Sequence, residues 1–377
     1  MYRISLFIFN YAIDKILMKK NFAILFICFA CIQFCYAQEK LHVVLVGLSH
    51  DHVNRMLEKN KASEIIIVGI AEANKELSNK KKVAYQVPDS IFYSNLTTAL
   101  KKNHPDLVMV YNAPTEHLAV IETCMPLHIP VMAEKPLCFS NAEAVKIEML
   151  SKKFNTKVYT NFPSAWYTSF IELAKRANEM GAINKMAMHG GHRGPIEIGC
   201  SKDFTNWLTN PAKNGGGAIT DFGCYGASIM TELMKGKKPI SVYATARHLK
   251  PTVYTKADDD ATIVLEYPNA TGIIEASWNW PYTIMDAEVY GKDLYLHASQ
   301  FNESKEQPSV QSKNEKELKT ENISEPQYKD EVAYLTAVIK NGASDNNTLL
   351  SLERNIIVVK ILAAAARSVK EGRKIIL

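Results

Sequence analysis

Apolar residues gather in short runs along the first part of the chain, and most of these runs are followed by turn residues and a helical pattern. Apolar runs that alternate with helices are typical of a parallel sheet that is buried on both faces. We expect strands at residues 41–46, 64–71, 92–93, 107–111, 131–133 and 158–160. These strands predict an α/β domain with a doubly wound parallel sheet over residues 38–160.

Residues 161–377 have a different pattern, because several runs there alternate apolar and polar residues. Pro268–Asn269 lies between two such runs and predicts an antiparallel hairpin. We expect strands at residues 185–189, 240–247, 261–267, 271–277, 287–290 and 294–298, and helices at 164–180, 328–340 and 350–370. They predict a second α/β domain with a large, open, mostly antiparallel sheet of about five or six strands. The polar stretch 301–327 is expected to be a mobile insertion.

The amino terminus has the pattern of a targeting segment. A basic start at Met18–Asn21 precedes an apolar run at residues 22–34 and a small-residue exit that ends at Ala37. This order is that of a secretory signal peptide, and the run is too short for a membrane span. We expect residues 1–37 to be a signal peptide, with Met18 as an alternative start. The protein would then be secreted across the inner membrane into the periplasm.

Charge and cysteine content narrow the classes of function. The formal charge of +5 falls to +2 when residues 1–37, which carry a net +3, are left out. A charge this small gives no electrostatic basis for binding nucleic acid or a membrane surface. The four cysteines after residue 37 lack zinc-site spacing and are expected to be buried thiols; they are Cys124, Cys138, Cys200 and Cys224.

The turn after the first strand has features of a dinucleotide site. Gly47 allows the backbone to approach a pyrophosphate, and the amino terminus of the following helix favours anions. Glu72 ends the second strand, 25 positions after Gly47, against about 20 in the usual fingerprint. An acidic residue at this place can accept hydrogen bonds from ribose hydroxyls, and it favours NAD over NADP because it repels a 2′-phosphate.

The same turn departs from the fingerprint, since Ser49 and His52 stand where glycines are expected. A βαβ unit that binds no nucleotide is therefore an alternative. His50, Asp51 and His52 also suggest a metal site. We disfavour that interpretation and expect no metal, because ligands this close together usually need further ligands to complete a geometry.

Lys135 is the first candidate for chemistry. It follows the buried run 131–133 and Glu134, and Pro136 keeps it out of the helical region. The side chain is thus expected at the carboxyl end of a strand, where open α/β sheets bind ligands. Burial there lowers the pKa of a lysine and makes it a usable proton donor or acceptor. The alternative is a surface lysine after an edge strand.

The second domain supplies further candidates after a run of three glycines, Gly215–Gly217. Asp221 could orient Lys135 or bind a hydroxyl, although it could also cap a helix. Tyr225 could exchange a proton, and a nearby ammonium would lower its pKa, or its ring could simply pack between the domains. The glycines would let the backbone approach a substrate. His189, His192 and Arg193 follow a strand and suit hydroxyl-rich ligands, while Trp207, Trp278 and Trp280 could stack on a sugar or lie in the core.

These motifs together resemble those of the Gfo/Idh/MocA oxidoreductases. The resemblance covers residues 41–377 and rests on Gly47, on Ala133–Pro136 and on Gly215–Tyr225. It implies a Rossmann domain that binds NAD, a second α/β domain, and homo-oligomers formed through the open sheet. It also implies a small sugar or sugar derivative as the substrate.

The resemblance further implies roles for individual residues. It assigns catalysis to Lys135, Asp221 and Tyr225. Cofactor binding is expected from Gly47, Ser49, His50, His52, Glu72, Asn112, Pro114, His117 and Glu134. Substrate binding is expected from Lys135, His192, Arg193, Trp207, Asp221 and Tyr225.

The sequence therefore predicts an exported NAD(P)-dependent oxidoreductase that moves hydride between a carbinol carbon of a sugar or polyol and nicotinamide. One alternative is a glycosidase or lyase that oxidises its sugar only transiently and regenerates the cofactor. Another is a sugar-binding protein of the same fold without catalysis, which the missing glycines favour and Lys135 opposes.

Overall fold

The computed structural model describes residues 39–299, 310–314, 317–321 and 326–377. The predicted signal peptide, residues 1–37, lies outside the described residues. Residues Leu41–Leu377 form one unit, which is described below.

The first sheet has the predicted doubly wound form. Within the described residues it contains six strands in the order β3-β2-β1-β4-β5-β6, all parallel. Their bounds are β1 His42–Val46, β2 Ile66–Ala71, β3 Phe92–Tyr93, β4 Leu107–Val110, β5 Val131–Glu134 and β6 Val158–Asn161. The strand order reverses between β1 and β4, so the carboxyl ends of these strands border the crevice where such sheets bind ligands.

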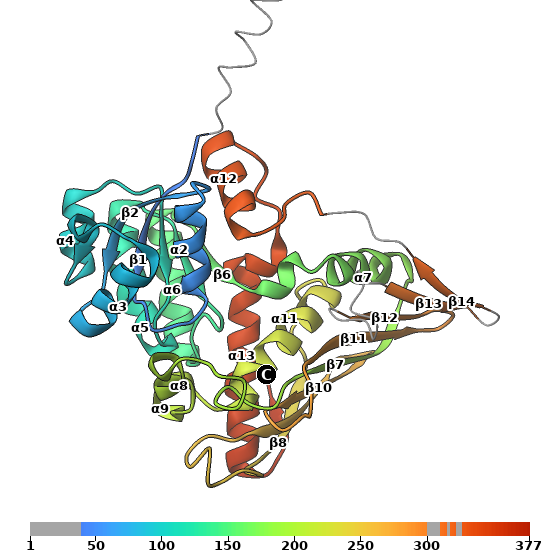
Figure 1. The fold of residues 1–377 in the computed structure, drawn as a ribbon. Helices are drawn as coiled ribbons and strands as arrows, with labels where there is room; N and C mark the ends of the chain where they lie inside the picture. The colour runs from blue at the N-terminus through green and yellow to red at the C-terminus, as the bar shows by residue number, and fades with distance from the viewer. Residues whose placement is uncertain (1–38, 300–309, 315–316, 322–325) are drawn as a thin grey trace, which may run out of the picture. The chain divides into compact units, whose positions relative to one another are not determined.

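Helices connect these strands and cover the sheet (Figure 1). They are α2 Val53–Lys61, α3 Lys75–Tyr85, α4 Leu96–Lys102, α5 Pro114–Cys124 and α6 Asn141–Phe154. Ser140 caps α6, because its hydroxyl accepts a hydrogen bond from the Glu143 amide at 3.4 Å. Helix α3 was not predicted; it is mostly polar, buries only Leu77, Ser78 and Lys81, and begins at an Asn74 cap.

The second sheet is mixed and larger than predicted. In the described parts of the chain it contains nine strands in the order β14-β13-β12-β11-β7-β10-β9-β8-β15. Their bounds are β7 Ile183–Gly191, β8 Ser241–Arg247, β9 Asp260–Glu266, β10 Thr271–Ser277, β11 Ile284–Gly291, β12 Tyr295–Ser299, β13 Val310–Asn314, β14 Glu317–Glu321 and β15 Ile375–Ile376. Only β7 and β10 pair in parallel, and β9 and β10 form the predicted hairpin. The fold class is confirmed.

The prediction of a mobile insertion at residues 301–327 was wrong for β13 and β14, which pair with each other and with β12. Both strands are rich in polar residues. Main-chain pairing at a sheet edge forms a strand without the apolar alternation that sequence patterns rely on.

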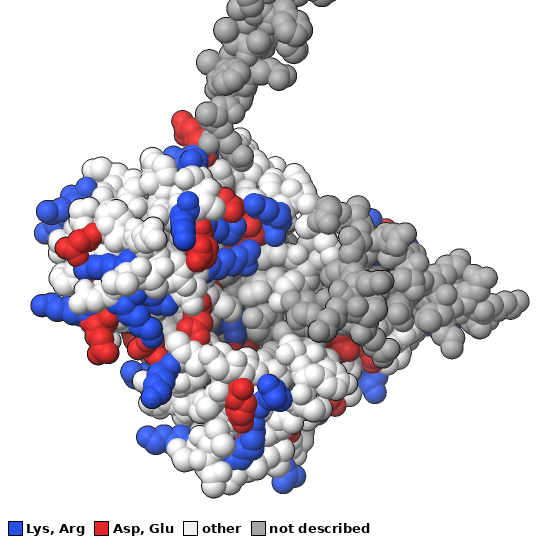
Figure 2. Space-filling model, viewed as in Figure 1, with Lys and Arg blue, Asp and Glu red and all other residues white. Residues whose placement is uncertain are grey.

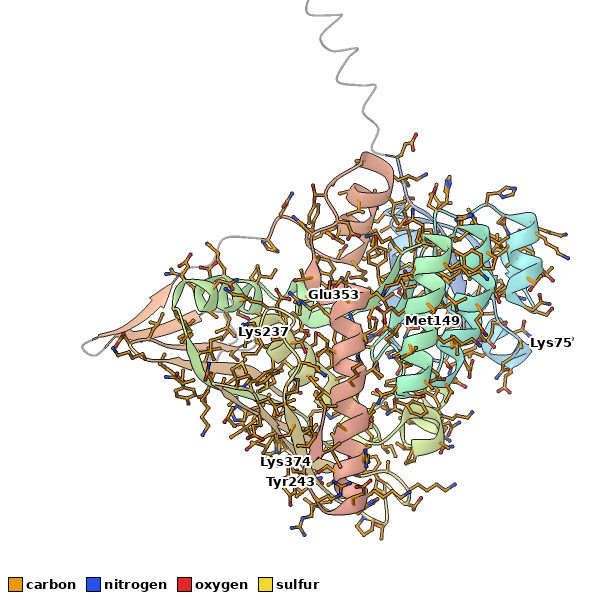
Figure 3. The ribbon with its side chains drawn as sticks, turned by 180° about the vertical axis from the view of Figure 1, so that it is seen from behind. Lys75, Met149, Lys237, Tyr243, Glu353 and Lys374 are labelled. Carbon is orange, nitrogen blue, oxygen red and sulfur yellow. The ribbon has the colours of Figure 1, made fainter. Side chains whose placement is uncertain are left out.

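The second half of the chain also contains helices, some of which pack on this sheet. They are α7 Thr168–Glu179, α8 Lys202–Leu208, α9 Pro211–Asn214, α10 Ala218–Asp221, α11 Gly223–Leu233, α12 Glu331–Asn341 and α13 Leu352–Glu371. Helix α11 is buried over nearly its whole length. Helix α13 packs against α6 of the first half and against α11 and β8 of the second; Figure 3 shows it between α6, marked by Met149, and the sheet near Tyr243 and Lys374. It therefore ties the two sheets together.

The surface and the cysteines agree with the composition. On the face shown in Figure 2, acidic and basic side chains are interspersed over the described residues. The four described cysteines are free thiols; Cys124, Cys138 and Cys224 are buried as predicted, whereas Cys200 is half-buried. Within the described residues, no helix combines the length and apolar character needed to cross a bilayer.

Candidate active site

Lys135 and Asp221 form a buried ion pair between the two halves of the unit. Lys135 directly follows β5, and Asp221 ends α10. The ammonium donates to Asp221 Oδ1 at 2.6 Å and lies 3.3 Å from its carbonyl oxygen. The exposed fractions of the two side chains are only 7% and 10%. The structure thus brings together two of the predicted catalytic residues, and the prediction that Lys135 could lie on the surface is excluded.

Tyr225 lies beside this pair, on α11. The Lys135 ammonium is 4.8 Å from the centre of its ring, and Phe162 packs edge-on against the ring at 5.7 Å between centroids. The catalytic set Lys135, Asp221 and Tyr225 is therefore assembled at one point. The alternative in which Asp221 caps a helix is wrong. Helix α11 begins after Phe222, and the amides at the start of α10 donate to Asp258 rather than to Asp221.

The sequence analysis expected the pKa values of Lys135 and Tyr225 to move toward neutrality, and the structure shows the opposite. Burial acts to lower the pKa of Lys135, but the Asp221 carboxylate and Tyr225 outweigh it and hold that pKa well above its ordinary value. Burial acts to raise the pKa of Asp221, and the ammonium reverses this. Burial raises the pKa of Tyr225, and the lowering by Lys135 is smaller. At neutral pH the set is an ammonium, a carboxylate and a neutral phenol.

Two residues hold Asp221 and the turn before it in place: Trp278, which the sequence allowed either on a sugar or in the core, and Asp258, which the sequence did not indicate. Trp278, fully buried after β10, donates its indole N–H to Asp221 Oδ2 at 3.0 Å. Asp258 accepts hydrogen bonds from the amides of Gly217, just before α10, and Ile219, in its first turn, each at 2.7 Å. A Cβ on Gly217 would lie 1.8 Å from the Asp258 carbonyl oxygen. The glycine at this position therefore allows the Asp258 backbone to approach closely, whereas the sequence analysis expected the glycines to allow the approach of a substrate.

The turn after β1 is closely fitted to its neighbours. Gly47 has φ of +77°, and a Cβ there would lie 2.7 Å from the Asn112 Cβ. Its amide bonds the Ala71 carbonyl, and the Leu48 amide bonds Glu72 Oε2 at 2.9 Å. The other oxygen of Glu72 accepts the Asn74 amide at 2.7 Å. Glu72 therefore braces the turn, with lone pairs still available on both oxygens.

His50, His52 and Glu134 converge above the ends of β1 and β5. His52 Nδ1 lies 3.1 Å and His50 Nε2 3.8 Å from Glu134 Oε2. The other oxygen of Glu134 accepts the Asn161 amide at 2.9 Å. Burial acts to raise the pKa of Glu134, but His52 and His50 outweigh it and set that pKa at about 2. Burial lowers the pKa of His50, so its ring is neutral at pH 7.

The remaining cofactor candidates lie along the same edge. Asn112 follows β4, and its buried Oδ1 has no hydrogen-bond partner within the described structure. Pro114 is the first residue of α5. His117 is buried in α5 with its ring nitrogens 3.0 and 3.3 Å from the carbonyls of Leu137 and Asn112, so it ties strand ends together. Ser49 is half-buried.

The substrate candidates fall into three places. His192 packs edge-on against Phe222 at 5.0 Å, and the charges of Asp221 and Lys135 influence its pKa, which burial lowers. Arg193 next to it is exposed. Trp207, on α8, is 5% exposed and packs on His50 at 5.5 Å, where it covers the first turn.

His189 lies away from these residues, on the sheet. It contacts Asp286 of β11 at 2.8 Å and Glu275 of β10 at 3.8 Å. It is therefore part of a charged cluster on β7, β10 and β11.

Comparisons with known proteins give consistent results. Trans-1,2-dihydrobenzene-1,2-diol dehydrogenase of Xenopus laevis is 26% identical over 200 residues, which cover 52% of this chain and 57% of that enzyme. The human enzyme of that name is 22% identical over 246 residues, 64% of this chain and 68% of the relative. The chain thus spans little more than half the length of the frog relative that it matches.

Solved structures share the fold. Aldose–aldose oxidoreductase of Caulobacter crescentus, complexed with glycerol, superposes with a TM-score of 0.74 at 20% identity and covers 90% of this chain and 100% of its own. An inositol dehydrogenase homologue of Azotobacter vinelandii, complexed with NAD⁺, has a TM-score of 0.74 at 14% identity and covers 90% and 98%. At these identities the likeness shows the fold alone.

Family models match both halves of the chain. The model described as an oxidoreductase family with an NAD-binding Rossmann fold matches residues 41–162, and the GFO/IDH/MocA C-terminal domain matches residues 174–297. The two matches lie in the same order as the two sheets. The chain belongs to the Gfo/Idh/MocA family of oxidoreductases, and its first half is the family's NAD-binding Rossmann domain.

Proposed function

We propose that this protein is an NAD-dependent dehydrogenase that acts on a carbinol carbon of a sugar, polyol or related diol. The observation that carries the proposal is the buried set of Lys135, Asp221 and Tyr225 at the edge of the NAD-binding sheet. Relatives named for a diol substrate, and a neighbour complexed with glycerol, support a hydroxyl-rich ligand. Asp221 and the nearby His192 can accept and donate hydrogen bonds to hydroxyl groups.

The residues at the sheet edge fit a dinucleotide. Within the turn 47–52, the amides of four residues donate to other groups of the chain. Those of Ser49 and Asp51 have no acceptor among the described residues, so they can donate to a pyrophosphate. Glu72 retains acceptor capacity for ribose hydroxyls. Asn112 offers a buried carbonyl oxygen without a partner. A bound nicotinamide would supply the hydride acceptor.

Lys135, Asp221 and Tyr225 would act on the charge that develops at the substrate oxygen. The substrate hydroxyl would give up its proton to the Asp221 carboxylate or to the neutral ring of His192, so that negative charge develops on its oxygen, and hydride would then leave the carbinol carbon to give the carbonyl. The ammonium of Lys135 stabilises that developing negative charge, and the neutral Tyr225 phenol donates a hydrogen bond to it. Asp221, fixed by Trp278, orients the ammonium. Burial of these groups excludes water and strengthens the interactions.

A direct test uses the purified protein without residues 1–37. We expect NAD⁺ to raise its melting temperature and one member of a panel of aldoses, inositols and vicinal diols to reduce NAD⁺ in an absorbance assay. Lys135→Ala should abolish reduction while the protein still binds NAD⁺. If the protein neither binds nor reduces NAD⁺, the interpretation that remains is a sugar-binding protein without catalysis. Cleavage of a glycoside with uptake of solvent deuterium, but no net NADH, would favour the redox-neutral alternative.

We also propose that the protein is exported and forms homo-oligomers through the open sheet. Export is supported by the basic start, apolar run and small-residue exit before Gln38. Assembly is supported by exposed aromatic residues on the strands, among them Tyr243 at 42% and Tyr290 at 36%. Amino-terminal sequencing of the mature protein and its mass in solution test the two statements separately.

A further inference from the structure

We propose that His50, His52 and Glu134 form a binding site for a divalent transition metal, of which Zn²⁺ is the best match. The sequence suggested a metal at His50, Asp51 and His52 but offered no further ligand. In the structure Asp51 turns away and accepts the Ser201 amide at 2.8 Å. Glu134, from a strand 82 positions further along than His52, takes its place.

The separations of the three ligand atoms suit a metal. One nitrogen or oxygen from each residue lies within 4.8 Å of the others. The two nitrogens are 3.1 and 3.8 Å from Glu134 Oε2. Tetrahedral zinc, with bonds of about 2.0–2.2 Å, needs ligand atoms about 3.4 Å apart. The imidazole of His52 is 40% exposed and can rotate to close the remaining distance.

The groups around the ligands are already arranged as a supporting shell. Asn161 donates to Glu134 Oε1 at 2.9 Å, which leaves Oε2 to face the imidazoles. The ring of His50 is fixed between Phe204 at 4.5 Å and Trp207 at 5.5 Å. Hydrogen bonds to a ligating carboxylate and packing around a ligating ring are the usual means of orienting metal ligands.

Metal binding at this place must displace protons. The His52 amide points at His50 Nδ1 at 3.1 Å, which assigns the ring proton of His50 to Nε2. His52 Nδ1 donates to Glu134 in the same way. A metal bound at His50 Nε2 and His52 Nδ1 therefore replaces hydrogens there. The proton of His52 can move to its other ring nitrogen, and His50 must turn away from the His52 amide before its own proton can move to Nδ1.

Two imidazoles and one carboxylate leave at least one coordination position open, as in catalytic zinc sites. Glu134 is followed directly by Lys135, whose amide also points at Glu134 Oε2 at 3.4 Å. A water or substrate oxygen in the open position would thus be bound next to the ion pair. The site itself needs neither NAD nor the proposed dehydrogenase reaction, so it can be tested without them.

The test is metal binding to the chelator-treated protein, measured by calorimetry with Zn²⁺ and by visible absorption with Co²⁺. We expect one Zn²⁺ per chain and a Co²⁺ spectrum of four- or five-coordinate metal. His52→Ala and Glu134→Gln should each weaken binding by at least about 100-fold, the upper end of what loss of a supporting group costs. His104→Ala, at an exposed histidine on the same domain, is the matched control.

Each result decides the proposal. Loss of binding in both ligand variants, with His104→Ala unchanged, supports it. Both variants must retain the circular dichroism of the unaltered protein, and Glu134→Gln keeps an acceptor for Asn161. Absence of stoichiometric binding by the unaltered protein overturns the proposal, and so does binding that survives in His52→Ala. Failure of NAD⁺ reduction would count against the proposed function and leave this result untouched.

Discussion

Two buried carboxylates, those of Glu134 and Asp221, lie next to Lys135 after β5, and their hydrogen bonds follow the same arrangement. In Glu134 one oxygen accepts the Asn161 amide and the other faces imidazoles. In Asp221 one oxygen accepts the Trp278 indole and the other faces the Lys135 ammonium. The two carboxylates differ in the basic group that faces the second oxygen. An ammonium keeps its charge and forms a lasting ion pair, whereas an imidazole can give up a proton and its lone pair can then bind a metal.

The comparison also separates what this chain shares with its family from what is its own. The Lys135 and Asp221 pair is the part on which the family resemblance rests. The imidazole cluster stands where a dinucleotide turn normally carries glycine. The predicted catalytic pair and the proposed metal ligands therefore lie at the same sheet edge.

The largest expected effect comes from removing the ammonium. Lys135→Met leaves the Asp221 carboxylate buried without its partner, which should cost about 3–5 kcal/mol of unfolding free energy. Turnover should fall by about 10²–10³-fold, because the group that stabilises negative charge on the substrate oxygen is lost. Urea unfolding and kcat/KM measure the two effects. The double variant Lys135→Met, Asp221→Asn should regain stability without regaining turnover; unchanged turnover in either variant would remove Lys135 from the mechanism.

The next effect concerns the glycine turn that carries Asp221. Asp258→Ala leaves the amides of Gly217 and Ile219 without acceptors, at roughly 1–3 kcal/mol for each buried group. Asp258→Asn retains one acceptor oxygen and should lose about half as much. Thermal unfolding of both variants measures this difference. Equal stability of Asp258→Ala and the unaltered protein would show that the turn is held by other contacts.

A smaller effect tests the indole. Trp278→Phe keeps most of the packing and removes the N–H that fixes Asp221, a hydrogen bond to a charged group worth about 1.5–3 kcal/mol. We expect kcat to fall more than KM rises, because Lys135 loses its orientation. Trp280→Phe, two residues along, is the control. A pH profile of kcat that does not change in Trp278→Phe would contradict a positioning role.

Sequence reasoning found the sheet edge because strand ends can be located from apolar runs. Lys135 follows such a run directly, and Asp221 follows a glycine run that resembles a family motif. Trp278 was expected only to stack on a sugar or to lie in the core, and Asp258 carried no signal. They reach Asp221 and Gly217 from 57 and 41 positions away through the strands of the second sheet. Only the pairing of those strands brings them into contact.

The same limit applies to the imidazole cluster. The spacing of His50 and His52 was visible, but the third ligand arrives from β5 across β4. Glu134 was predicted as a cofactor residue and His50 as a residue that faces a nucleotide. The packing of α8 on the first turn, through Trp207 and Phe204, buries His50 instead. No local sequence pattern predicts a contact between a loop of one domain and a helix of the other.

The smallest expected effect uses a third carboxylate, Asp286, which lies between two imidazoles as Glu134 does but is partly exposed. His189 lies 2.8 Å and His297 3.4 Å from it. Burial acts to raise the pKa of Asp286, but these hydrogen bonds outweigh it and set that pKa at about 2; the bond to Asp286 raises the pKa of His189.

The signs of these shifts define a pH window. A depressed carboxyl pKa stabilises the fold above its ordinary value of about 4, and the stabilisation is lost as pH falls toward 2. A raised histidine pKa stabilises the fold below about 6.5, and the stabilisation is lost as pH rises through the folded value. Both are complete near pH 5, where Asp286→Asn should cost about 1 kcal/mol or less because the groups are partly exposed. At pH 9 the cost should be smaller, so equal losses of melting temperature at the two pH values would show that His189 does not depend on Asp286 for its charge.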